Sequence, residues 1–148
     1  MLFFIVKTLL HKFICPILKG KISFFKMGKI ESFENLLCWQ ACREVISLVR
    51  KTIQSLPIDE KYDLVSNMRR AARSTTRNIA EGFGRHHHKE NIQFCRISRG
   101  SLNELLDDFI TCHNDEYISE EELKRARICI NNALKILNGY INYLKRIS

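Results

Sequence analysis

Residues 119–146 read SEEELKRARICINNALKILNGYINYLKR and contain the signals of one long α-helix. Ser119 and Glu122 have the spacing of a capping box, in which the two side chains satisfy backbone N–H groups at the start of a helix. Glutamates fill the first turn and a Lys-Arg pair fills the last, so both ends complement the helix dipole. Apolar residues recur every three or four positions and predict an amphipathic helix with one stripe to bury: Leu123, Ala126, Ile130, Ala133, Leu137, Ile141 and Leu144.

Three segments upstream repeat this spacing. The first follows Ser32 as N-cap and is stopped by Pro57, with a stripe of Phe33, Leu36, Leu37, Ala41, Val45, Leu48, Val49, Ile53 and Leu56. The second follows Asp59 as cap and ends at Gly82, with a stripe of Tyr62, Val65, Met68, Ala72, Thr75 and Ile79. The third begins within residues 86–89, with a stripe of Ile92, Cys95, Ser98, Leu102, Leu105, Phe109 and Cys112.

Four amphipathic helices joined by short connections must pack against one another, because packing rather than propensity stabilises most protein helices. The 148 residues include only two prolines and six glycines, and no segment has the pattern of a strand pair. We therefore expect one all-α domain, an antiparallel up-down-up-down four-helix bundle.

The first 26 residues, MLFFIVKTLLHKFICPILKGKISFFK, differ from the rest in having no acidic residue and many Phe, Ile, Leu and Lys. They make a poor secretory signal and lack the roughly 18 uncharged apolar residues of a membrane span, so no stable membrane insertion is expected. The division predicted is a leader over residues 1–26 and a four-helix bundle domain over residues 27–148. The leader is either disordered, an amphipathic helix on a membrane surface, or the product of a start codon called upstream of a true start at Met27.

The cysteines form no Cys-x-x-Cys pair, and most lie within the apolar stripes: Cys15, Cys38, Cys42, Cys95, Cys112 and Cys129. We interpret them as reduced, buried side chains of a cytoplasmic protein rather than disulfides or metal ligands. Cys38 and Cys42 share a helix face, but two ligands make a poor metal site.

Part of the net charge of +8 is concentrated between residues 59 and 100, which contain nine basic and five acidic residues. Residues 68–99 read MRRAARSTTRNIAEGFGRHHHKENIQFCRISR. Arg69, Arg73 and Arg77 would form a ridge on a helix with Arg70 beside it, and antiparallel packing would add Arg85, Lys89, Arg96 and Arg99. Such a patch can bind RNA or DNA phosphates, and no aromatic residue interleaves the arginines to read single strands. The open alternative is a solvated face paired with Glu81, Glu90 or a neighbouring subunit's acids.

We expect the other polar residues of this region to have structural rather than catalytic roles. Asn78 and Glu81 lie near a helix end without a second carboxylate for acid–base chemistry, so Glu81 is expected to bind an arginine and Asn78 to satisfy backbone groups. His86, His87 and His88 are consecutive and point about 100° apart, so they predict an exposed turn rather than a metal site.

Gly100 and Ser101 fall within the third predicted helix, where small residues allow close approach of another helix. The chain has no Walker loop, nucleophile elbow or paired carboxylates. It therefore predicts no enzyme, no cofactor and no metal.

The motifs of this region resemble those of the four-helix-bundle family named for 23S rRNA intervening-sequence proteins. They are Arg69-Arg70-Ala71-Ala72, Ser74, Asn78-Ile79-Ala80-Glu81-Gly82-Phe83-Gly84-Arg85, Lys89-Glu90 and Gly100-Ser101-Leu102-Asn103-Glu104-Leu105. Trp39, Ala41, Tyr117-Ile118-Ser119 and Leu137-Asn138-Gly139-Tyr140 extend the similarity over about residues 32–147. Thr75 stands where the family commonly has Ile, and Asn91 where it has an aromatic residue.

The resemblance implies a bacterial cytosolic bundle that assembles as a ring-like homopentamer without enzymatic activity. Relatives include proteins encoded within inserts in large-subunit rRNA genes, and the accessory subunit of diversity-generating retroelements, which binds a reverse transcriptase and nucleic acid. The function expected from the sequence is a non-enzymatic, homo-oligomeric bundle that binds RNA or DNA through phosphates with little sequence specificity. The alternative is a protein-interaction scaffold whose basic face docks an acidic partner or a neighbouring protomer.

Overall fold

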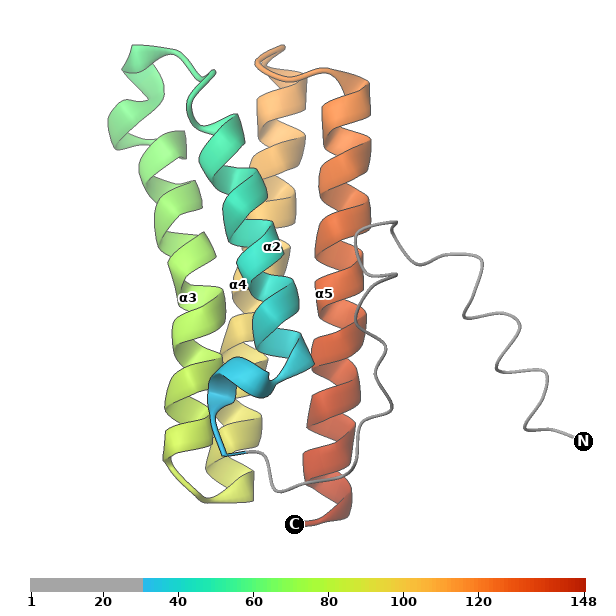
Figure 1. Ribbon diagram of the computed structural model, residues 1–148. Coiled ribbons are helices and arrows are strands. Elements are labelled where there is room, and N and C mark those ends of the chain that lie inside the picture. The colour runs from blue at the N-terminus through green and yellow to red at the C-terminus, as the bar shows by residue number, and fades with distance from the viewer. Residues whose placement is uncertain (1–30) are drawn as a thin grey trace, which may run out of the picture.

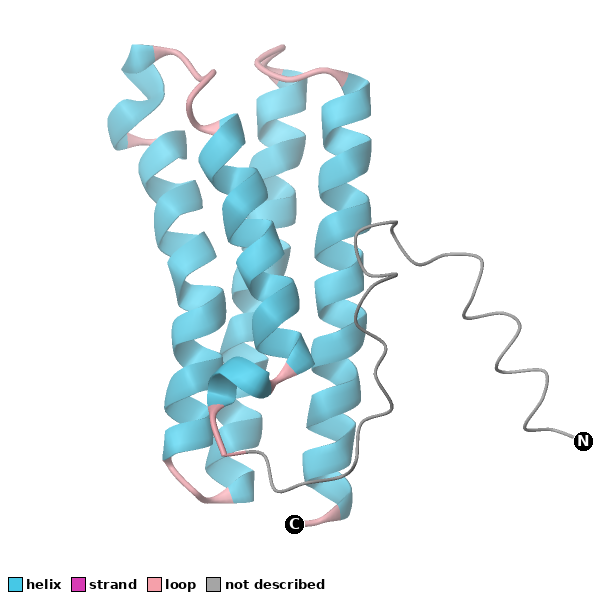
Figure 2. Cartoon of the chain, in the orientation of Figure 1, coloured by secondary structure: helices cyan, strands magenta, loops and turns pink. Residues whose placement is uncertain are grey.

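The computed structural model describes residues 31–148, and this part of the chain is an all-α four-helix bundle with no strand. Figure 1 shows successive helices running in opposite directions, and Figure 2 shows the short connections between them. The long helices are α2 (Leu37–Thr52), α3 (Leu64–Gly84), α4 (His88–Asn114) and α5 (Glu120–Arg146), and two 3₁₀ helices, η2 (Phe33–Asn35) and η3 (Ile58–Tyr62), precede α2 and α3. The predicted fold class is confirmed, whereas the predictions for residues 1–26 lie outside the described residues.

The helices form a closed four-sided arrangement. Helix α2 contacts both α3 and α5, and α4 contacts the same two helices. Helix α5 begins with the predicted capping box, in which Ser119 Oγ accepts from the Glu122 N–H and the Ser119 N–H donates to Glu122 Oε2. Its buried residues are the seven predicted from the sequence, and the large side chains fully buried against them include Phe109, Met68, Leu102 and Leu105.

The start of the first predicted helix differs from the expectation. Ser32 caps η2, where its Oγ accepts a hydrogen bond from the Glu34 N–H at 3.3 Å. Leu36 then adopts an extended conformation and is buried, and α2 begins only at Leu37, which is 67% exposed. The chain thus leaves the helical conformation at Leu36, whose side chain lies in the core.

The second predicted helix was wrong at both ends. Asp59 lies within η3 and α3 begins after Asp63, so Asp59 is not its cap. At the other end α3 continues through Gly82, which is buried and helical rather than the residue after the helix. The chain reverses instead at His86, which has a φ of 54°.

The cysteines of the described chain lie in or beside the core. Cys38, Cys42, Cys95 and Cys112 are free and buried, and Cys129 is partly buried. Burial raises the pKa of Cys38 and Cys95 to about 12, and that of Cys42 and Cys112 to about 11. These four thiols therefore stay protonated at neutral pH and act as small apolar side chains.

Candidate nucleic-acid interface

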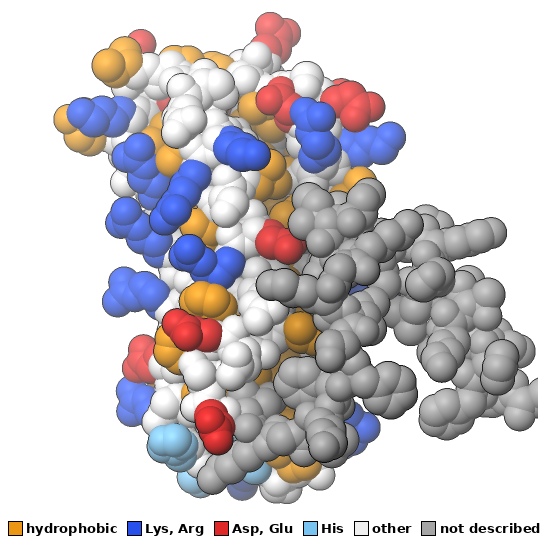
Figure 3. All heavy atoms as spheres, in the orientation of Figure 1, with side chains coloured by type: hydrophobic (Ala, Val, Ile, Leu, Met, Phe, Trp, Pro, Cys, Tyr) orange, Lys and Arg blue, Asp and Glu red, His pale blue; other side chains and the backbone are white. Residues whose placement is uncertain are grey.

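The exposed face of α3 carries a ridge of arginines. Helix α3 buries the face that carries Met68 and Ala72 in the core. The other face is therefore exposed, and it carries Arg69, Arg73 and Arg77. Residues four apart on a helix are about 6 Å apart along its axis, so the ridge is roughly 12 Å long. In Figure 3 Lys and Arg side chains gather along the α3 side of the molecule.

A groove of about 360 Å³ runs along this ridge. The residues that line it come from η3 and α3: Lys61, Tyr62, Ser66, Arg69, Arg70, Arg73 and Arg77. Four of the eight predicted phosphate contacts therefore lie together.

Tyr62 was predicted in the buried stripe of the second helix, and this prediction was wrong. The ring is 84% exposed, since η3 ends at Tyr62 and α3 begins two residues later with the buried Leu64. Lys61 Nζ lies 5.1 Å from the centroid of the Tyr62 ring. The sequence reasoning missed both side chains as members of the groove, because they precede the arginine-rich segment.

The arginines of the groove differ in their ion pairing. Arg70 Nη2 lies 3.1 Å from Glu104 Oε1 on α4, which ties this guanidinium to the bundle. Arg69, Arg73 and Arg77 form no ion pair with any other residue between 31 and 148. The ridge is thus a row of three guanidinium groups without a countercharge from the described chain.

The other four predicted contacts are exposed but do not line the groove. Arg85 Nη2 lies 2.8 Å from Glu81 Oε1, and this hydrogen bond raises the pKa of Arg85. Arg99 Nη1 donates to Asn138 Oδ1 on α5 at 3.3 Å, away from α3. Arg96 donates to Gln93 on its own helix, and Lys89 lies in the first turn of α4.

Among the residues predicted as a structural motif, Ser101 links α4 to α3 by a side-chain hydrogen bond. Ser101 Oγ lies 2.7 Å from Ser74 Oγ, and Asn78 Nδ2 donates to Ser74 Oγ at 2.9 Å and to the Ser74 carbonyl at 2.8 Å. Asn78 therefore satisfies a backbone carbonyl as predicted, but within the helix rather than at its end. Glu81 binds an arginine, as expected.

The two glycines of the motif have different environments. A Cβ at Gly82 would lie 2.8 Å from Phe94 Cβ, so this glycine permits the close approach of α3 and α4. A Cβ at Gly100 would have no neighbour within 4 Å in the described chain. The prediction that Gly100 allows helix packing is wrong for the bundle itself, because this residue faces outward.

Thr75 and Asn91, the two departures from the resembled pattern, are buried with polar partners. Thr75 Oγ1 donates to the Ala72 carbonyl at 2.7 Å, and the Thr75 carbonyl accepts from Ser98 Oγ at 2.8 Å. Asn91 Nδ2 donates to the Tyr140 hydroxyl at 3.0 Å. Hydrogen bonds thus satisfy both of these buried polar side chains.

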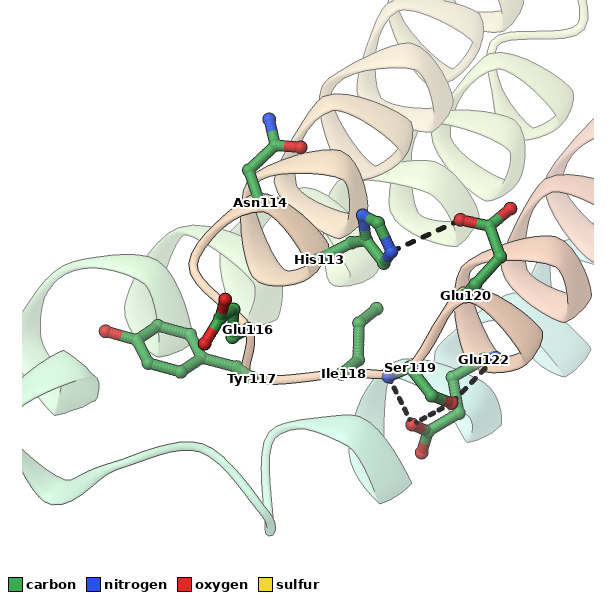
Figure 4. Close-up of a pocket in the computed structure, with 8 residues that line it drawn as sticks. All are labelled: His113, Asn114, Glu116, Tyr117, Ile118, Ser119, Glu120 and Glu122. Atoms are coloured by element: carbon green, nitrogen blue, oxygen red, sulfur yellow. Dashed lines mark hydrogen bonds and ion pairs between the residues drawn. The ribbon is translucent and has the colours of Figure 1, made fainter.

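A second hollow, of about 640 Å³, lies at the connection between α4 and α5 (Figure 4). His113 Nε2 lies 3.2 Å from Glu120 Oε2, and Glu122 is held by the capping box. The Tyr117 hydroxyl donates to Glu60 Oε1 at 3.0 Å, which raises the pKa of Tyr117. These contacts hold the connection in place.

Residues 31–148 contain no group of three His, Cys, Asp or Glu side chains arranged to hold a metal ion. In the same part of the chain, no helix has the length and apolar character needed to cross a membrane. The three consecutive histidines are exposed, as predicted.

The fold and the groove together define a helical-bundle protein with a basic surface along one helix. More specifically, the chain belongs to the 23S rRNA-intervening sequence protein family, whose profile matches residues 34–139. The matched segment includes η3 and the whole arginine ridge. A comparison with curated proteins finds no match.

Proposed function

We propose that this protein is a non-enzymatic bundle that binds RNA or DNA by holding phosphates along the arginine ridge of α3. The observation that supports the proposal is the absence of a countercharge for Arg69, Arg73 and Arg77 among the described residues. A guanidinium group can donate two parallel hydrogen bonds to one phosphate, which suits it to this contact better than an ammonium group.

The size of the ridge sets the number of phosphates. A stacked strand carries one phosphate per 3.4 Å, so a ridge of about 12 Å spans three or four of them. Three contacts predict that affinity falls about 40-fold for a duplex, and about 20-fold for a single strand, between 50 and 200 mM salt. Little sequence preference is expected, because phosphate contacts carry no base information.

The test is a salt titration of the full chain with labelled structured RNA and duplex DNA, beside an Arg73→Glu/Arg77→Glu variant. Reversal of both charges should abolish binding at every salt concentration. An Arg127→Glu/Lys135→Glu variant makes the same charge change on exposed residues of α5 and should retain most of the affinity. Equal losses in the two variants would mean that net charge, rather than the ridge, determines binding.

We further propose a cytoplasmic homo-oligomer, for which the resemblance implies a homopentamer. The four free, buried thiols support a reducing compartment. Assembly would repeat the groove once per subunit and raise the affinity for a long nucleic acid through multivalency. Light scattering of the purified chain, in which a monomer would contradict the proposal, tests the assembly.

The second candidate function is a scaffold that docks a neighbouring protomer or a protein partner such as a reverse transcriptase. Two large apolar side chains on adjacent helices favour it, since Ile97 on α4 is 52% exposed and Ile128 on α5 is 64% exposed. If the ridge takes part in assembly, the Arg73→Glu/Arg77→Glu variant will dissociate. An intact oligomer in this variant, with nucleic-acid binding lost, would favour the first function.

A further inference from the structure

Tyr62 lies at the end of the groove where η3 leads into α3, and its environment is unusual for a tyrosine. Its side chain is 84% exposed in a groove that also holds Arg69, Arg73 and Arg77, which bind no described carboxylate. Aromatic rings placed next to a basic groove bind unpaired bases by stacking, which is tolerant of sequence because every base has a π-face. We infer that the groove binds single-stranded nucleic acid, with one unpaired base stacked on Tyr62 and the following phosphates on the arginine ridge.

This inference rests on the proposed phosphate binding and adds the class of ligand. Bases inside a duplex already stack on one another, so a duplex can present its phosphates to the ridge but no base to Tyr62. A single strand can do both. The groove should therefore bind a single strand more tightly than a duplex of the same sequence.

The backbone on both sides of Tyr62 is held by the fold. Glu60, two residues before Tyr62 in η3, accepts a hydrogen bond from the Tyr117 hydroxyl at 3.0 Å, which ties η3 to the α4–α5 connection. On the other side of Tyr62, Leu64 and Val65 are buried at the start of α3. A ring carried on a backbone that is already ordered adds little backbone entropy cost when a base binds.

Lys61 adds a positive charge to the platform. Its ammonium group lies 5.1 Å from the centre of the Tyr62 ring, which is within the range of a cation–π contact. Because most of the ring is exposed, it still has surface free for a base. The phosphate attached to a base stacked there would lie between Lys61 and the first arginines of α3.

The test compares three probes by fluorescence anisotropy with the full chain at one low salt concentration. The probes are a labelled oligothymidylate, an abasic strand of the same length, and a duplex. Wild type should bind the oligothymidylate most tightly. Tyr62→Ala should lose roughly 5- to 150-fold in affinity for the oligothymidylate, the range measured for one stacked base, and keep its affinity for the abasic strand.

Two variants control for the stacking role. Tyr62→Trp, which keeps an aromatic face, should retain the preference for the oligothymidylate. Tyr143→Ala removes another exposed tyrosine, on α5 and outside the groove, and should bind all three probes as the wild type does.

The outcomes separate this inference from the proposed function. If wild type binds the abasic strand as tightly as the oligothymidylate, phosphate binding stands and the base platform is refuted. If Tyr62→Ala loses affinity by the same factor for the oligothymidylate and for the abasic strand, Tyr62 supports the shape of the groove rather than a stacked base, and the inference is again refuted. If wild type binds none of the probes, the proposed function fails and the inference fails with it.

Discussion

Replacing Gly82 by alanine tests how closely α3 and α4 approach each other. The added Cβ would lie 2.8 Å from Phe94 Cβ, 2.9 Å from Asn91 Oδ1 and 3.2 Å from Asn91 Cα. Carbon atoms in contact are usually about 3.5 Å apart or more, so the Phe94 contact is short by about 0.7 Å. Two of the three neighbours are backbone or Cβ atoms, which cannot move unless the helix moves.

The expected effect is the difference between two opposing contributions. Overpacking of this kind destabilises proteins by about 1–3 kcal/mol, whereas alanine is favoured over glycine within a helix by about 1 kcal/mol. Displacement of α4 would also strain the hydrogen bond from Asn91 to Tyr140. We therefore expect the free energy of unfolding of Gly82→Ala to fall by about 1–2 kcal/mol.

Urea unfolding followed by circular dichroism at one protein concentration measures this change, and the chain offers a matched control. Gly100 also lies within a helix, but a Cβ there meets nothing within 4 Å in the described chain. Gly100→Ala should therefore raise the free energy of unfolding by about 0.5–1 kcal/mol. Equal effects of the two substitutions would refute the close contact between α3 and α4 at Gly82.

Three further predictions concern buried polar and thiol groups. Burial, with repulsion from neighbouring acids, raises the pKa of Asp108 to about 6 from 3.8, so the free energy of unfolding should fall as pH rises between these values. In urea unfolding, the Asp108→Asn variant should therefore be more stable than the wild type above about pH 6 and equally stable near pH 4. Tyr140→Phe leaves the buried Asn91 amide without its acceptor and should lose about 1–3 kcal/mol in the same assay, whereas Tyr143→Phe should be neutral. In the native protein, mass spectrometry after iodoacetamide treatment should find four buried thiols unmodified until urea is added: Cys38, Cys42, Cys95 and Cys112.

The sequence predicted the bundle well where the pattern was strong over a long segment. In α5 a capping box and seven stripe positions agree with one another, and the structure contains all of them. Local signals of this kind report on hydrogen bonds within a few residues, so they do not depend on how the rest of the chain packs.

The helix ends were harder to predict because tertiary contacts decide them. Asp59 and Gly82 are suited to capping by residue type, yet Asp59 lies within η3, and Gly82 lies within α3 where it packs closely against α4. The same shift of the helix start moved Tyr62 from a predicted core position to the surface. A periodic pattern assigns a residue to a face only after the helix boundaries are known.

In the candidate site too, some features follow from local spacing and others depend on tertiary contacts. Spacing alone was enough to place Arg69, Arg73 and Arg77 on one ridge, since residues four apart share a helix face. Whether an arginine has an acidic partner depends on the neighbouring helix, as the contact of Arg70 with Glu104 shows. No local pattern distinguishes such an arginine from one without a partner.

The arrangement of the ridge is unfavourable for the helix that carries it. Like charges four residues apart destabilise a helix by roughly 0.2–0.5 kcal/mol per pair, and Arg73 forms such a pair with both Arg69 and Arg77. Near its end the same helix has the favourable arrangement, in which Glu81 precedes Arg85 by four residues and binds it at 2.8 Å. A polyanion bound along the ridge would add an attractive contact to each guanidinium group and offset the repulsion within both pairs, so binding and the stability of α3 would increase together. This coupling is the physical reason for placing the proposed ligand on the three arginines that have no described acid beside them.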